Sequence, residues 1–361
     1  MIYWLQELIE RRSAVRHGKD LAAVMGMLLL LFLGGCGQGL LPGSSRSFFA
    51  MDTMMDLSAR GGQAEQALEE VETELHRLEK LLSRTRSGGP IWEVNQSNGQ
   101  ACLVGEEVCG LLKEAQRYHD LSGGAFDPTL AAVSDAWGFT EECQRVPAAQ
   151  ELTALLDQSG MDRVQIQEGG VLRLEPGVQL DLGGIAKGYA ADRGADIFRR
   201  CGVTSGTLSL GGNLWVCGEK EPGVPWRVGV QDPRRVGERD GYVGTLDLSD
   251  AFAVTSGGYQ RFFEENGKRY HHILDPKTGM PAESGLISVT IVSAESGTLC
   301  DALSTALFVL GEEQALDLWR EMAGTFQAVL VTEDGRVLVT AGLESVFQEA
   351  EGSGYRYEMV T

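Results

Sequence analysis

The second half of this chain alternates short β-rich segments with helical ones, and this alternation restricts the folds that it can adopt. Strands are predicted, from runs of apolar and β-branched residues, at 164–167, 172–174, 207–210, 227–230, 242–248, 287–292 and 327–340. Helices are predicted between them at about 186–201, 298–310 and 312–322. Glu333-Asp334-Gly335, between two alternating apolar runs, is a hairpin signal. Hairpins mixed with helices favour an α+β fold over a doubly wound parallel sheet.

The first half of the folded region is predicted to be helical. One apolar stripe with spacings of three and four residues predicts a helix at about 64–83, and a second helix is predicted at about 107–120. The stripe consists of Leu68, Val71, Leu75, Leu78 and Leu82. The chain is 43% hydrophobic and has no linker, repeat or low-complexity tract after residue 47. Residues 48–361 are therefore predicted to form one compact domain, a mixed or antiparallel sheet with packed helices.

An apolar run of 13 residues, 21–33, stands near the start of the chain behind several basic residues. This order is typical of an export signal, and the run is shorter than the about 20 apolar residues needed to span a bilayer. It ends in Gly34-Gly35-Cys36, which resembles the bacterial lipobox, where the cysteine becomes lipidated. We therefore predict a lipoprotein signal peptide at 1–35 and a lipidated flexible tether at 36–47, with the protein held on the extracytoplasmic side of the cell membrane. The alternative is an uncleaved anchor.

The net charge of −20, from 51 acidic and 31 basic residues, argues against nucleic acid as a partner. An anionic ligand still fits such a protein where a divalent cation or a helix N-terminus receives it. Six cysteines remain besides Cys36 and none forms a Cys-x-x-Cys pair, so a zinc or redox motif has no support. Their wide spacing leaves every disulfide pairing open, and Cys201 and Cys300 are expected to be core residues.

The densest motif is the segment 181–190, with the sequence DLGGIAKGYA. A strand ending at Asp181, a glycine pair and a helix beginning near Ala186 would let backbone N–H groups and Lys187 approach a phosphate. The spacing is neither that of a Walker motif nor that of a Rossmann fingerprint. The alternative interpretation is a glycine-rich start of a helix without a ligand.

The apolar helix predicted at 298–310 is interrupted by Asp301 and Thr305, which are four residues apart and so share one face. An unpaired buried carboxylate is costly. A hard cation that takes the carboxylate, the hydroxyl and nearby carbonyl oxygens would compensate it. Alternatively, Asp301 faces solvent or caps a turn.

Two of the five histidines, His271 and His272, stand directly before an Asp-Pro-Lys-Thr-Gly turn. Histidine is the usual proton acceptor near neutral pH. Neighbouring residues of a strand point in opposite directions, so at most one of the pair is expected to enter a site. Upstream, 253–259 supplies hydroxyls and glycines, or is an ordinary end of a strand.

A further loop, 123–129, contains Phe126 and Asp127 and is followed by Trp137-Gly138-Phe139. Flat aromatic rings pack well on a flavin or an adenine. Taken alone, however, this segment is better explained by core aromatics around a turn.

Together and in this order, four motifs resemble the ApbE family of FAD:protein FMN transferases: GAFDPT…WGF, DLGGIAKGYA, TSGGY…HHILDPKTG and DALSTA. The resemblance extends from Met51 to Gly311. It implies an α+β enzyme, exported and often lipidated, that transfers the FMN half of FAD to a threonine or serine hydroxyl of an acceptor protein and releases AMP. Such acceptors are flavin-carrying proteins, for example subunits of membrane redox complexes.

The resemblance also implies roles for particular residues. His272 would be the general base that activates the acceptor hydroxyl. Mg²⁺ would be bound by the side chains of Asp301 and Thr305 and by the backbone carbonyls of Ala186 and Ser304. FAD would be bound by Met51, Ala125, Phe126, Asp127, Asp181 and Lys187.

One departure from the family pattern concerns the segment 83–90. Family members commonly have an aromatic residue where this chain has Thr85, and a serine or an acid where it has Gly89-Pro90. The flavin side of the pocket is therefore expected to be more open or differently lined. Two alternatives to the transferase remain from the sequence: an FAD pyrophosphatase that yields FMN and AMP, and a non-enzymatic FAD-binding lipoprotein.

Overall fold

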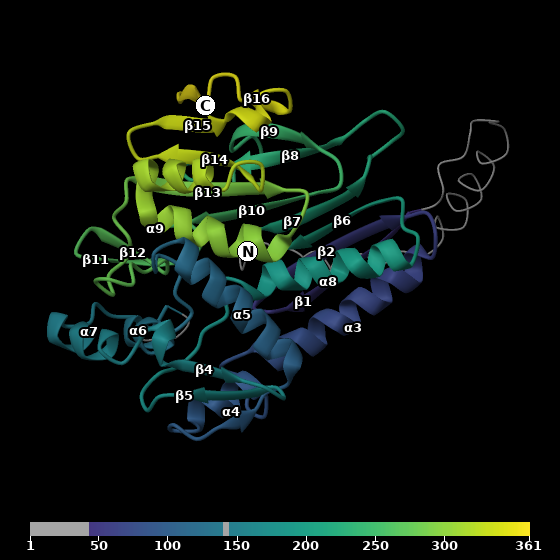
Figure 1. The fold of residues 1–361 in the computed structure, drawn as a ribbon. Coiled ribbons are helices and arrows are strands. Elements are labelled where there is room, and N and C mark those ends of the chain that lie inside the picture. Colours follow the sequence, from purple (N-terminus) through teal and green to yellow (C-terminus); the bar gives the residue numbers. More distant parts are fainter. Residues whose placement is uncertain (1–42, 140–143) are drawn as a thin grey trace, which may run out of the picture. The chain divides into compact units, whose positions relative to one another are not determined.

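A sheet of nine strands, seen across the upper half of Figure 1, is the centre of the computed structural model, which describes residues 43–139 and 144–361. In order across the sheet the strands are β1 (Ser44–Ala50), β2 (Thr53–Arg60), β6 (Ser205–Leu210), β7 (Asn213–Gly218), β10 (Ala251–Gly257), β13 (Leu286–Ser293), β14 (Gln327–Thr332), β15 (Arg336–Thr340) and β17 (Arg356–Val360). All neighbours are antiparallel except the last pair, which is parallel. The predicted α+β fold with a mixed sheet is confirmed.

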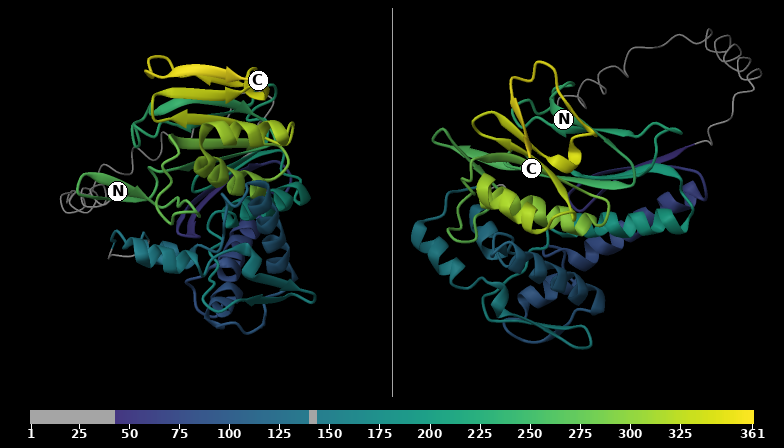
Figure 2. Two further views of the ribbon diagram at one scale, coloured as in Figure 1. Left: turned by 60° about the vertical axis from the view of Figure 1, so that its left-hand side comes forward. Right: turned by 45° about the horizontal axis from the view of Figure 1, so that its top comes forward.

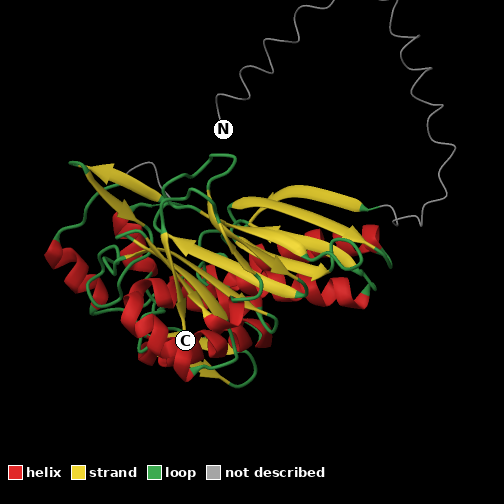
Figure 3. Cartoon of the chain, turned by 90° about the horizontal axis from the view of Figure 1, so that it is seen from above, coloured by secondary structure: helices red, strands yellow, loops and turns green. Residues whose placement is uncertain are grey.

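Three helices pack on one face of this sheet. Helix α3 (Ala64–Leu82) lies against β1 and β2, α8 (Ala186–Arg200) against β6 and β7, and α9 (Gly297–Glu321) against β10 and β13. Figure 2 keeps them on the same face in two further views, and Figure 3 shows helices gathered along one side of the strands. The predicted apolar stripe of α3 is fully inside the main core.

The opposite face of the sheet carries a second, smaller core. Here β8 (Trp226–Gln231), β9 (Tyr242–Leu248) and β16 (Phe347–Glu349) form a three-stranded sheet. Successive side chains of a strand point to opposite faces of the sheet, so neighbouring residues of β14 belong to different cores. Leu330 is part of the core under the helices, and Val331 is part of the second core.

The remaining elements lie mainly between α3 and α8 in the sequence. They are α4 (Pro90–Gln96), β3 (Cys102–Leu103), α5 (Glu106–Leu121), α6 (Ala131–Trp137), α7 (Ala149–Leu156), β4 (Val164–Gln167) and β5 (Val171–Leu174), followed later by the hairpin of β11 (Phe262–Glu265) and β12 (Lys268–His271). In Figure 1, α4, α6, α7, β4 and β5 lie below the central sheet.

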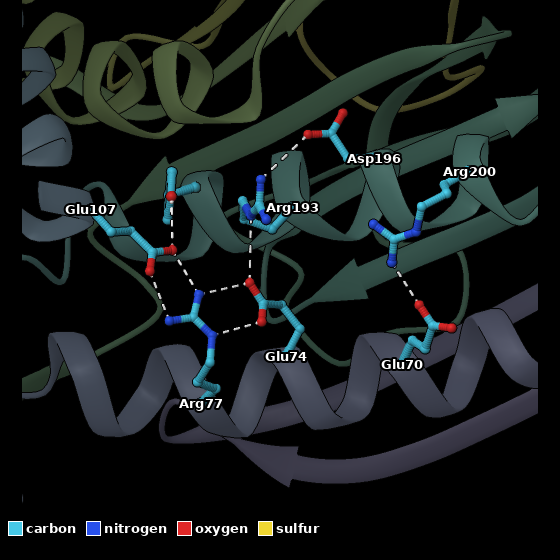
Figure 4. Close-up of polar contacts among 8 residues, drawn as sticks. Glu70, Glu74, Arg77, Glu107, Arg193, Asp196 and Arg200 are labelled. Atoms are coloured by element: carbon cyan, nitrogen blue, oxygen red, sulfur yellow. Dashed lines mark hydrogen bonds and ion pairs between the residues drawn. The ribbon is translucent and has the colours of Figure 1, made fainter.

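Ion pairs connect α3 to both α5 and α8 (Figure 4). Arg77 of α3 donates to Glu107 of α5 at 2.6 Å and to Glu74 one turn away at 2.7 Å. Arg200 of α8 pairs with Glu70 of α3 at 2.6 Å. Since these side chains are partly exposed, each pair contributes only about 0–1 kcal/mol and chiefly orients the helices.

The predicted signal peptide, the first part of the predicted tether and Cys36 lie outside the described residues, as does Cys143. The prediction of a flexible tether as far as residue 47 is wrong at its end, because Ser44–Ser47 already belong to β1 and pair with β2. The five described cysteines are free thiols, and Cys201 and Cys300 are buried, as predicted. In the part of the chain that the structure describes, no helix is both long enough and apolar enough to cross a membrane.

Candidate functional site

A cavity of about 680 Å³ opens where loops from both halves of the chain meet. This volume lies in the range typical of cofactor sites. Its wall contains nearly all the residues that the sequence predicts as site residues: Met51, Ala125, Phe126, Asp127, Asp181, Ala186, Lys187, His272, Asp301 and Thr305. Ser304, predicted to act through its backbone carbonyl, is buried directly behind the wall, where its Oγ lies 2.8 Å from Oγ of Ser256.

Two tight hairpin turns form one wall of the cavity. Met51 and Asp52 connect β1 to β2 with φ of 49° and 59°, and Gly211 and Gly212 connect β6 to β7 with φ of 61° and 100°. Positive φ at both central residues is required by the turn that suits a two-residue hairpin. A Cβ at Gly211 would lie 2.3 Å from Oγ1 of Thr53, so glycine there lets the two turns approach each other.

Asp301 lies on the first turns of α9, deep in the cavity and only 4% exposed. Its Oδ2 accepts a hydrogen bond from the backbone N–H of Gly188 at 2.8 Å. One turn further along, Oγ1 of Thr305 lies 3.3 Å from Oγ of Ser256. The two side chains that the motif places on one face therefore both reach the cavity, among hydroxyl groups.

The donor atoms around Asp301 fit a hard cation. Within residues 43–139 and 144–361, no group of three or more His, Cys, Asp or Glu side chains is arranged to hold a metal ion. A single carboxylate beside hydroxyls and carbonyl oxygens suits Mg²⁺, which usually keeps several waters and takes phosphate oxygens of its substrate as ligands. The buried, cavity-facing carboxylate of Asp301 agrees with such a site.

The close crossing of α8 and α9 positions Asp301. A Cβ at Gly188 would lie 2.2 Å from the carbonyl oxygen of Gly297 and 2.6 Å from Cβ of Asp301. We expect Gly188→Ala to lower the free energy of unfolding by about 1–3 kcal/mol, the usual cost of overpacking, and to weaken any function of Asp301. Urea denaturation measures the first effect.

Gly110→Ala is the matched control for this prediction. Gly110 lies inside α5, and a Cβ there would meet nothing within 4 Å. Alanine is the better helix former, so this variant is expected to be about 0.5–1 kcal/mol more stable than the wild type. Equal stability of the Gly188→Ala and Gly110→Ala proteins would contradict the proposed tight crossing.

Asp181 lies at the centre of a hydrogen-bond network that the sequence analysis missed. Its Oδ1 accepts from the backbone N–H of Gly183 at 2.8 Å, and its Oδ2 accepts from Nε of Arg84 at 2.9 Å. Arg84 also binds both carboxylate oxygens of Asp135, at 2.6 and 3.0 Å. Lys187 lies nearby with its Nζ 3.3 Å from the carbonyl of Gly183. Arg84 lies within the segment 83–90, but its partners Asp135 and Asp181 are distant in sequence, so no local pattern indicates them.

Asp127 and Phe126 line the cavity in different ways. Both the backbone N–H and the hydroxyl of Thr129 donate to Oδ1 of Asp127, at 2.8 and 2.6 Å. Burial raises the pKa of Asp127, and these two donors oppose the rise. The Phe126 ring packs closely over Gly184, where an added Cβ would lie 3.2 Å away.

The aromatic pair after this loop is mostly core, as the alternative interpretation holds. Trp137 is fully buried, donates its Nε1–H to the carbonyl of Gly279 at 2.8 Å, and stacks on Phe139 with ring centroids 5.7 Å apart. Phe139 alone of the pair lines the cavity. Thr85 is exposed at the cavity wall, so no ring covers that side at this position.

Only His272 of the histidine pair lines the cavity. Its Nδ1 lies 3.2 Å from the carbonyl oxygen of Arg261. A carbonyl can only accept, so Nδ1 carries the proton and Nε2 keeps a free lone pair. Burial lowers the pKa of His272 to about 4, which keeps the ring neutral.

His271 has a different environment. Its ring meets the ring of Phe308 edge-on, with centroids 5.4 Å apart, and its Nδ1 is buried without a hydrogen-bond partner among the described residues. Burial lowers its pKa as well.

The geometry of the site as a whole places a neutral base, an oxygen-rich carboxylate site and a lysine around one cavity, which suits transfer of a phosphate-containing group.

Comparison with known proteins gives one consistent result. Residues 51–330 match the model of the ApbE family. A Treponema pallidum protein named FAD:protein FMN transferase is 37% identical over 293 residues, covering 77% of this chain and 80% of that protein. A Klebsiella pneumoniae protein of the same name is 32% identical over 285 residues, covering 78% of this chain and 87% of that protein.

Solved structures agree with the sequence relatives. The crystal structure of an ApbE protein from Thermotoga maritima has a TM-score of 0.78 at 32% identity, and the match covers 86% of this chain and 100% of that one. The apo form of the Pseudomonas stutzeri flavinyl transferase ApbE has a TM-score of 0.73 at 31% identity, covering 83% and 94%. Identities of 32% and 31% indicate common ancestry as well as a common fold.

Proposed function

This chain is a transferase that belongs to the ApbE family, and we propose that it moves the FMN half of FAD onto a threonine or serine hydroxyl of an acceptor protein. The observation that carries the proposal is the convergence of His272, Asp301 and Thr305 on one cavity of about 680 Å³. The base and the carboxylate site come from segments far apart in sequence. An FAD store would not need a neutral base beside them.

In the proposed step, the acceptor hydroxyl oxygen bonds to the phosphorus of the FMN half of FAD. The bond between that phosphorus and the bridging pyrophosphate oxygen breaks, and AMP leaves with the bridging oxygen. His272 Nε2 takes the hydroxyl proton, since Nδ1 already donates to the carbonyl of Arg261. The product is a phosphoester between FMN and the acceptor.

Bound Mg²⁺ would neutralise charge on the pyrophosphate and on the leaving AMP. The residues that would hold it are Asp301 and Thr305 by side chain, with the carbonyls of Ala186 and Ser304. Lys187, at the start of α8, and Asp181, held by Arg84, would orient FAD along the same wall. Positioning and electrostatics supply most of the rate enhancement in transfers of this kind.

The experiment that tests the function combines the protein with FAD, Mg²⁺ and a candidate acceptor. We expect the acceptor to gain the mass of FMN less one water, with one AMP released for each label. FMN and AMP without labelled acceptor would instead identify an FAD pyrophosphatase. Tight FAD binding without AMP would identify a carrier.

We also propose that the protein is anchored by lipid at Cys36 on the extracytoplasmic face of the cell membrane. The support is the short apolar run before Gly34-Gly35-Cys36, which suits a cleaved signal better than a membrane span. Cys36→Ala is expected to abolish incorporation of labelled fatty acid and to leave an unprocessed precursor. Labelling of the variant as strong as that of the wild type would refute the lipobox.

A further inference from the structure

We propose that Glu79 is a positioning residue for FAD, because its carboxylate holds the Met51-Asp52 turn in the conformation that forms one cavity wall. This inference rests on the proposed function. Glu79 lies near the C-terminal end of α3 and itself lines the cavity, with a side chain that is 12% exposed. Its role would be to shape the binding site, with no part in the chemical step.

The turn that Glu79 contacts is one that the local sequence does not favour. A hairpin turn with positive φ at both central residues prefers Asn-Gly, whereas here Met51 and Asp52 take φ of 49° and 59°. Residues other than glycine keep a positive φ only where the surrounding structure holds them in it, and such residues concentrate at functional sites. The neighbouring turn of the same wall has glycine at both positions, Gly211 and Gly212, and so needs no such support.

The Met51-Asp52 turn is held by one hydrogen bond between residues that are 28 positions apart in the sequence. Oε1 of Glu79 accepts from the backbone N–H of Met51 at 3.0 Å. Met51 is also packed, half-buried, against the main core. Because α3 is fixed on the sheet by its apolar stripe, the carboxylate provides a rigid point to which the turn is attached.

The second oxygen of the same carboxylate holds another part of the wall. Oε2 of Glu79 accepts from Nη1 of Arg86 at 2.5 Å, and Arg86 lines the cavity in the loop after α3. The guanidinium of Arg86 offsets the negative charge of the Glu79 carboxylate, which would otherwise repel an anionic ligand. Glu79 therefore connects the hairpin turn to the 83–89 loop and remains compatible with pyrophosphate.

Four variants of the full-length protein in detergent separate these contacts. Glu79→Leu removes both of them. Glu79→Gln keeps an acceptor oxygen for Met51, and Arg86→Met removes only the second contact. Glu70→Leu is the matched control, because Glu70 is on the same helix and pairs with Arg200 (Figure 4). Neither residue of this pair lines the cavity.

FAD affinity is measured by titrating flavin fluorescence with each apoprotein in the presence of Mg²⁺, and turnover by AMP release with acceptor. We expect Glu79→Leu to raise the Kd and KM for FAD roughly 10- to 100-fold, the range for losing a hydrogen bond to a charged group, with kcat at saturating FAD within about threefold. Glu79→Gln and Glu70→Leu are expected to stay within about threefold in Kd. Asp52→Gly in the Glu79→Leu background should recover part of the lost affinity, since glycine accepts the turn without support.

Three outcomes would overturn the inference. One is an unchanged Kd in Glu79→Leu, and another is a loss confined to kcat. The third is an equal loss of affinity in Glu70→Leu, which would mean that loosening α3 anywhere has the same effect. Failure of the wild type itself to bind FAD would refute the proposed function, and this inference with it.

Discussion

Asp301→Ala is expected to lower Mg²⁺-dependent turnover by roughly 10³-fold, equivalent to about 4 kcal/mol of transition-state stabilisation. Asp301 is the carboxylate of the predicted metal site, buried to 4% exposure and facing the cavity. Without it the remaining protein ligands are neutral oxygens, which bind Mg²⁺ weakly. The measurement is the initial rate of AMP release over a Mg²⁺ titration at saturating FAD and acceptor.

Two further variants separate metal binding from structure. Asp301→Asn keeps an acceptor for the N–H of Gly188, so it is expected to retain wild-type stability and still lose turnover. Thr305→Val removes a neutral ligand only and is expected to have a smaller effect than Asp301→Ala. An Asp301→Ala protein with an unchanged Mg²⁺ dependence would show that the metal site lies elsewhere.

His272→Ala is expected to lower kcat by roughly 10²- to 10⁴-fold, the range for losing general-base assistance, while FAD binding is retained. The lone pair on Nε2 is available because Nδ1 donates to the carbonyl of Arg261. Single-turnover labelling of the acceptor at saturating FAD separates this chemical defect from binding. An unchanged labelling rate would exclude His272 as the base.

His271→Ala is the control for this substitution. The His271 ring packs edge-on against Phe308 away from the cavity wall, so its loss is expected to lower the melting temperature and leave kcat nearly unchanged. A larger loss of kcat in His271→Ala than in His272→Ala, both measured below their melting temperatures, would reverse the assignment within the pair.

The lowered pKa of His272 also predicts the pH dependence. The free enzyme loses its base only when His272 is protonated, so kcat/KM is expected to be level from pH 8 to about 5 and to fall near pH 4. In the unfolded chain the pKa returns to about 6.5, so between pH 6.5 and 4 the unfolded state binds more protons. The free energy of unfolding therefore falls as the pH is lowered through this window. Circular dichroism at each pH distinguishes unfolding from loss of the base.

Some strands, one hairpin turn and one helix break were predictable from the sequence. The bounds of β4 and β9 match the predicted strands, and the Glu333-Asp334-Gly335 turn connects β14 to β15 as the hairpin signal indicated. The predicted break between two C-terminal helices corresponds to Gly311, whose φ of 77° and ψ of 176° interrupt α9. Each of these signals is contained within a few residues, so no tertiary contact is needed to interpret it.

Other strands gave no local signal. Strand β1 has Ser, Ser, Arg and Ser in its first four positions and is held at the edge of the sheet by its pairing with β2. In β10 the first four residues are all buried, since helices cover one face of the sheet and the second core covers the other, so the alternation that marks a strand is missing. Tertiary burial on both faces removes the pattern.

The sequence alone determined the motif residues of the site, because the spacing of Asp301 and Thr305 and the order of the glycine-rich segments are local properties. Tertiary structure decided which distant groups act together. Three such features are the attachment of Met51 to Glu79, the network of Arg84 with Asp181, and the position of His272 at the cavity wall while His271 packs against Phe308. They depend on sheet register and on the packing of helices against the sheet. The lowered pKa of His272 likewise comes from burial by segments remote in sequence. Such contacts depend on how the elements pack, which no short stretch of residues specifies.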